Sequence, residues 1–168
     1  MGQPIPQPAN PGKGGSPYDD AMNLALKFLG PRARSKSEVR DKLEQAQTPE
    51  ATTEEVLHRL EELALVNDAE LATDMAERAR SRGESSSRVR SGLKFRGLSE
   101  VPGLVDSSGE EERDRALKLA ISRARALRNL PPQVAQRRLA AYLGRRGYNY
   151  DIVKEVCRKA LSEEASDD

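Results

Sequence analysis

The residues of this chain best suited to chemistry are basic side chains gathered in its second half. Positions 78–96 hold seven basic residues and one acid, and positions 113–146 hold ten basic residues and one acid. The whole chain has 28 basic and 27 acidic residues, so its net charge of +1 hides these two blocks. Such blocks can bind nucleic acid or an acidic protein surface, or they can be solvated helix faces.

Part of this charge falls on one face of a predicted helix. At about 100° per residue, Leu139 and Leu143 lie on one side, whereas Arg137, Arg138 and Arg145 lie on the other. A basic face that repeats along the chain would suit an extended, repetitive partner. The candidate residues for contact with a partner protein or a DNA backbone are Arg88, Arg90, Lys94, Arg96, Arg137, Arg138, Arg145 and Arg146.

Residues that could support catalysis or hold a cofactor are scarce. The sequence has neither a G-x-x-x-x-G-K-[ST] phosphate loop nor a G-x-G-x-x-G turn. Its single histidine, His58, lies on a predicted helix without an accompanying nucleophile motif, which favours a surface or partly buried role. Its single cysteine, Cys157, follows Val153 and Val156 on an apolar face, as a small core residue would. We therefore expect that the protein is not an enzyme and that it has no cofactor and no metal site.

The elements that must position the basic residues are predicted to be helices. Ala and Leu total 39 residues, whereas Val and Ile total 12, a balance that favours helix over strand. Apolar residues recur with helical spacing, and two capping boxes are predicted, Ser35 with Glu38 and Thr52 with Glu55. Pro102 and Gly103 interrupt the segment 99–106, which should form only a short or broken helix.

An internal period of 50 residues relates three of these predicted helices. It links Val39 to Val89 and Leu139, Leu43 to Leu93 and Leu143, and Gly97 to Gly147. Each helix lies between two others, so the chain is predicted to be all-α, with three tandem three-helix repeats. The first copy departs from the pattern, because Gln47 stands where the other two have glycine.

The two ends differ in composition from the repeats. The Pro- and Gly-rich head, 1–18, has too little apolar surface to offset the entropy of ordering, so it is expected to be disordered. The acidic tail, 162–168, is expected to fray. No apolar stretch is long enough for a transmembrane span or a signal peptide, and a single cysteine suits a reducing compartment. We therefore expect a cytoplasmic protein.

Short motifs, in their order along the chain, resemble the RecX family. They are Ala25–Leu29 with Arg34, Ser35, Glu38, Val39 and Leu43; Leu60–Leu63 with Val66–Asp68 and Ala72; Arg90–Leu93 with Arg96 and Gly97; and Ala135–Leu143 with Arg145–Tyr148 and Val153. The resemblance extends from about residue 19 to residue 161. It implies repeats at 19–66, 67–108 and 109–161, which form an elongated, curved array.

The resemblance also implies a function. RecX proteins bind along the RecA recombinase filament on DNA and restrain its growth, its ATP hydrolysis and its strand exchange, within DNA repair and recombination. By this resemblance the partner is the RecA filament, direct contact with DNA is left open, and a monomer is expected. The alternatives are a stand-alone helical nucleic-acid-binding protein and a scaffold without a regulatory role. Comparing naked DNA with recombinase-coated DNA would discriminate between them.

Overall fold

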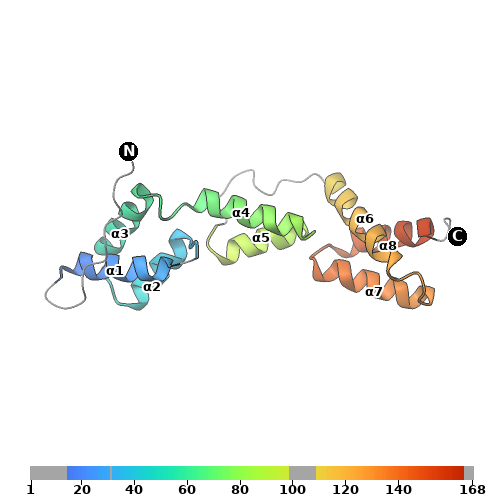
Figure 1. Cartoon of the computed structure of the whole chain (residues 1–168), viewed down its shortest axis with the longest axis horizontal. Helices are drawn as coiled ribbons and strands as arrows, with labels where there is room; N and C mark the ends of the chain where they lie inside the picture. Colours follow the sequence, from blue (N-terminus) through green and yellow to red (C-terminus); the bar gives the residue numbers. More distant parts are fainter. Residues whose placement is uncertain (1–14, 31, 99–108, 165–168) are drawn as a thin grey trace. The chain divides into compact units, whose positions relative to one another are not determined.

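The computed structural model describes residues 15–30, 32–98 and 109–164, and within these ranges it contains eight helices and no strand (Figure 1). The helices are α1 (Pro17–Leu29), α2 (Lys36–Gln45), α3 (Glu50–Glu62), α4 (Asp68–Ser81), α5 (Ser86–Phe95), α6 (Gly109–Arg125), α7 (Pro132–Arg145) and α8 (Tyr150–Glu164). The prediction of an all-α fold is therefore confirmed. None of these helices is long and apolar enough to span a membrane.

The first helix begins earlier than predicted. Ser16 caps α1: its hydroxyl accepts a hydrogen bond from the Asp19 N–H at 3.2 Å, and the Asp19 carboxylate accepts one from the Ser16 N–H at 3.1 Å. Pro17 occupies the first helical position, where its missing N–H is not needed. Pro17 and Tyr18 are thus helical and do not belong to the head. The rest of that segment, 1–14, lies outside the described residues.

One of the two predicted capping boxes is confirmed and the other is wrong. Ser35 and Glu38 form a reciprocal pair at the start of α2, with distances of 2.8 and 3.1 Å. Helix α3 instead starts at Glu50, directly after Pro49, and has no side-chain cap. The Pro49 carbonyl accepts the first helical hydrogen bond, from the Thr53 N–H at 2.9 Å, so Thr52 is already inside the helix.

The described helices belong to two compact units. The first comprises residues 1–72 and 96–100, and the second comprises residues 73–95 and 101–168. In the first unit, helices α1, α2 and α3 pack around a buried core. The core residues are Ala21, Ala25, Leu29, Val39, Leu43, Val56, Leu57, Leu60 and Val66. Each buried Val or Leu contributes roughly 1.5–3 kcal/mol, so this small core can hold three short helices together.

In the second unit, α6, α7 and α8 form a three-helix group. The fully buried residues of α6 are alanines, Ala116, Ala120 and Ala124, and their small side chains let α8 approach closely. Cys157 of α8 is 1% exposed in this core, as its apolar neighbours predicted. Helix α8 continues to Glu164, three residues beyond the predicted end of the repeat at residue 161.

The 50-residue period is visible in the backbone as well as in the core. All six apolar residues that it relates are buried: Val39, Leu43, Val89, Leu93, Leu139 and Leu143. The residue two positions after the end of each middle helix has a positive φ, which is 58° at Gln47, 70° at Gly97 and 88° at Gly147. Gln47 therefore adopts the left-handed conformation of its glycine counterparts, and the departure in sequence does not change the turn. The predicted short helix at 99–106 lies outside the described residues.

Candidate partner-binding surface

Three of the predicted arginines form an exposed face on α7. Arg137, Arg138 and Arg145 are exposed, whereas Leu139 and Leu143 of the same helix are buried. Within the described part of the chain, none of the three guanidinium groups has a hydrogen-bond or ion-pair partner. Their donors are therefore available to carboxylates or phosphates of another molecule.

The basic residues of α5 are also exposed. Arg90 and Lys94 lie one turn apart, and neither has a partner among the residues that the structure describes. Arg88 lies 3.7 Å from the Glu84 carboxylate. Arg88 stands 50 residues before Arg138, but no basic residue stands 50 after Arg90 or Lys94. The period therefore repeats only one of the three α5 cations.

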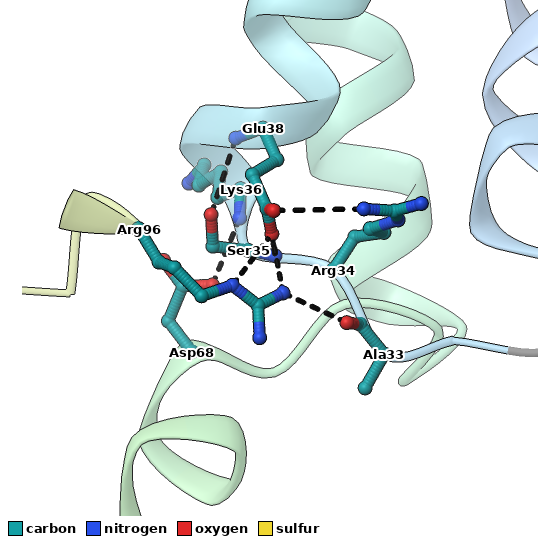
Figure 2. Close-up of polar contacts among 7 residues, drawn as sticks. All are labelled: Ala33, Arg34, Ser35, Lys36, Glu38, Asp68 and Arg96. Atoms are coloured by element: carbon teal, nitrogen blue, oxygen red, sulfur yellow. Dashed lines mark hydrogen bonds and ion pairs between the residues drawn. The ribbon is translucent and has the colours of Figure 1, made fainter. Parts of the chain in front are cut away.

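Arg96 is engaged inside the first unit, where it holds the start of α2. Figure 2 shows its guanidinium beside Glu38: Nε donates to Glu38 Oε2 at 3.1 Å, and a terminal nitrogen donates to the Ala33 carbonyl at 2.9 Å. Arg34 approaches the other carboxylate oxygen at 3.7 Å. The backbone N–H of Lys36 donates to Asp68 at 2.8 Å in the same cluster. Arg96 therefore has a structural role that its position in a basic block did not reveal.

This cluster lowers the pKa of the Glu38 carboxyl. Partial burial raises its pKa, but hydrogen bonds from Arg96 and from the Ser35 N–H, together with the charges of Arg96 and Arg34, outweigh burial. The net effect holds the Glu38 pKa below its ordinary value of 4.5. The carboxylate is consequently ionised at neutral pH, where its ion pair with Arg96 is complete.

Arg146 has a corresponding place in the second unit. Its carbonyl accepts a hydrogen bond from the Ser85 N–H at 2.9 Å, and its Nε donates to the Arg82 carbonyl at 3.2 Å. Its guanidinium also lies 3.9 Å from the centre of the Tyr142 ring. Nearby, the buried Tyr148 hydroxyl donates to the Gly83 carbonyl at 3.2 Å. Arg96 and Arg146 are therefore equivalent junction residues, each joining the end of one middle helix to the start of an earlier one.

One exposed residue was missed because its type is typical of a core. Phe95, at the end of α5, is 92% exposed. The 50-residue period contained the signal, because Phe95 corresponds to Arg145, which lies on the surface of α7. Helical spacing gave the same signal, because at about 100° per residue Phe95 lies about 200° from the buried Leu93, on the opposite side of the helix.

The helices and their turns define an all-helical protein built from three-helix domains. Models of the RecX first and third three-helix domains match residues 21–60 and 110–157, respectively. A regulatory protein RecX of Streptomyces lividans is 32% identical over 157 residues, covering 90% of this chain and 82% of the relative. One of Deinococcus radiodurans is 34% identical over 164 residues, covering 94% and 76%, respectively.

A solved structure agrees with this fold. The crystal structure of RecX from Lactobacillus salivarius superposes with a TM-score of 0.65 at 21% identity, over 86% of this chain and 96% of that one. The chain therefore belongs to the RecX family of regulatory proteins.

Proposed function

We propose that this protein binds the RecA recombinase filament on DNA and restrains its assembly, ATP hydrolysis and strand exchange. Membership of a family of regulatory proteins named RecX supports this proposal. The protein would act by binding, as a cytoplasmic monomer, and would catalyse no reaction of its own. Its three repeats would occupy 19–66, 67–108 and 109–161.

The observation that carries the proposal is the set of exposed cations on α5 and α7. We assign the contact surface to Arg88, Arg90, Lys94, Arg137, Arg138 and Arg145. Five of these six have no partner within the described ranges, and Arg88 has only a long ion pair. Because Arg96 and Arg146 stabilise the fold, we remove them from the contact surface and expect their loss to act through stability.

The test is charge reversal on α7. Changing Arg137, Arg138 and Arg145 to glutamate should leave helicity unchanged, since exposed substitutions away from buried features usually change stability by less than about 0.5 kcal/mol. Binding to recombinase-coated DNA should fall by at least roughly tenfold, as expected when charged contacts become repulsive. The affinity of the parent protein should fall as salt rises.

A matched control has the same change of charge on other elements. Lys118 of α6, Arg128 and Lys154 of α8 are exposed and have no partner among the described residues. Changing these three to glutamate should reduce binding much less than the α7 variant. An equal loss of binding in both variants would mean that net charge, and not the α7 face, determines binding. A folded α7 variant that binds and inhibits like the parent would place the contact surface elsewhere.

The alternative of a stand-alone nucleic-acid-binding protein predicts a different result in the same experiment. Naked single- or double-stranded DNA would then bind as tightly as recombinase-coated DNA at the same salt concentration. The proposal requires a clear preference for the coated DNA.

A further inference from the structure

A groove between α4 and α5 has an apolar floor. It measures about 180 Å³, lies within the second unit, and is lined by residues of both helices and of the turn that joins them. Met75 and Ala79 of α4, and Val89 and Leu93 of α5, contribute to its lining. The volume is sufficient for one large apolar side chain but too small for a drug-sized ligand.

Gly92 and Phe95 extend this apolar surface out of the groove. Gly92 lines the groove, and a β-carbon added to it would meet nothing within 4 Å, so a partner can approach the α5 backbone there. Arg88, Gly92 and Phe95 follow the i, i+4, i+7 spacing of one helix face. The exposed Phe95 ring therefore lies one turn beyond the opening at Gly92. Aromatic residues beside an apolar pocket are typical of the centre of a protein–protein interface.

The edge of the groove is basic. Arg78, Arg82 and Arg88 line it, with Glu84 as the only acid in the lining. Glu84 lies 3.0 Å from Arg82 and 3.7 Å from Arg88, so one carboxylate is shared between two cations. The lining as a whole keeps a net charge of +2, which an acidic segment would complement.

We propose that the α4–α5 groove and Phe95 form a docking site for an acidic protein segment that inserts one large apolar side chain beside Gly92. The apolar floor favours a protein over nucleic acid, because a phosphate backbone gains nothing from burial against Val89 and Leu93. This site goes beyond the proposed function: it shares Arg88 with the proposed contact surface but does not depend on the basic face of α7. Its occupant is defined by chemistry: carboxylates for the edge and an aliphatic or aromatic anchor for the floor.

The chain offers a clean spectroscopic test because it contains no tryptophan. The probe is a synthetic acidic peptide of about twelve residues with one central Trp, typical in length of segments that dock in grooves. The tryptophan fluorescence of the mixture therefore comes from the peptide, because the protein has no tryptophan. With the full chain we expect a saturable blue shift, which a basic peptide with the same Trp should not show.

Two variants locate the site. Gly92→Gln should fill the opening and weaken peptide binding by roughly tenfold. It should not unfold the protein, because the added side chain has open space and glutamine is a better helix former than glycine. Gly144→Gln is the matched control, since Gly144 is also helical with nothing within 4 Å of an added β-carbon. Phe95→Ser should weaken binding in the same direction as Gly92→Gln.

Each other outcome overturns the proposal. These outcomes are the absence of a saturable shift, equal loss in Gly92→Gln and Gly144→Gln, and displacement of the peptide by single-stranded DNA but not by unlabelled acidic peptide. Concentration-dependent dimerisation that Phe95→Ser abolishes would assign the site to a second copy of the chain. Because these measurements contain no recombinase, a failure of the proposed function would leave their outcome unchanged.

Discussion

Replacing Gly97 with alanine should destabilise the first unit by about 1–5 kcal/mol. Gly97 has a φ of 70°, a left-handed conformation that costs a residue with a β-carbon about 1–2 kcal/mol. The new β-carbon would also lie 2.5 Å from Cβ and 2.7 Å from Oγ of Ser37. Ser37 lies in the first turn of α2 and cannot move away without moving the helix, so overpacking adds about 1–3 kcal/mol. The reduced entropy of the unfolded alanine chain returns about 0.4–1 kcal/mol.

The equivalent turn after α2 supplies the opposite change as an internal comparison. Gln47 has a φ of 58° despite its β-carbon. Gln47→Gly should relieve that strain, and after the entropy of the unfolded glycine is subtracted it should stabilise the protein by up to about 1 kcal/mol. Urea-induced unfolding followed by helicity measures both changes. The two substitutions should therefore shift the free energy of unfolding in opposite directions.

The single cysteine reports on the second unit in the same samples. Cys157 is 1% exposed, and burial raises the pKa of its thiol, so a thiol reagent should label it only when that unit opens. Gly97→Ala should leave the labelling rate without denaturant close to that of the parent. An unchanged free energy of unfolding in Gly97→Ala, or a lower one in Gln47→Gly, would refute the assignment of strain to the left-handed residue of these turns.

Two further predictions concern the polar ends of helices. Because the folded-state pKa of Glu38 lies below 4.5, its ion pair stabilises the protein fully above that pH, and the stabilisation is lost as pH falls through the folded-state value. Glu38→Gln should thus lower the unfolding midpoint at pH 7, and the gap to the parent should narrow below pH 4.5; a constant gap would contradict this. Ser16→Ala should cost α1 about 1 kcal/mol through loss of its cap, measured by urea unfolding, whereas a change at the exposed Asp20 should have little effect.

Helical periodicity was enough to predict the helices and much of the core. Val39, Leu93 and Leu143 repeat with a period set by local geometry, so their burial follows from spacing alone. The start of α3 was predicted wrongly because a capping motif at Thr52 competes with Pro49 three residues upstream, and the helix starts directly after the proline.

The roles of the basic residues were harder to predict because their partners are distant in sequence. Arg96 finds Glu38 from 58 residues away, and Arg146 finds the Arg82 carbonyl from 64 residues away. Neither contact leaves a local signal, so both arginines resembled their exposed neighbours. Only the three-dimensional structure separates the cations that stabilise the fold from cations such as Arg138, which is exposed and has no partner among the described residues.

The composition of the first unit has a consequence for how the chain folds during synthesis. That unit consists of residues 1–72 together with residues 96–100, so its final contacts wait until α4 and α5 have been translated. Until Arg96 emerges, the ionised Glu38 at the start of α2 has only the longer ion pair with Arg34. The nascent first unit therefore passes through a less stable stage whose length is set by translation of the intervening segment, 73–95. Slow codons within that segment would prolong this stage, and with it the exposure of the unfinished unit to proteases and aggregation.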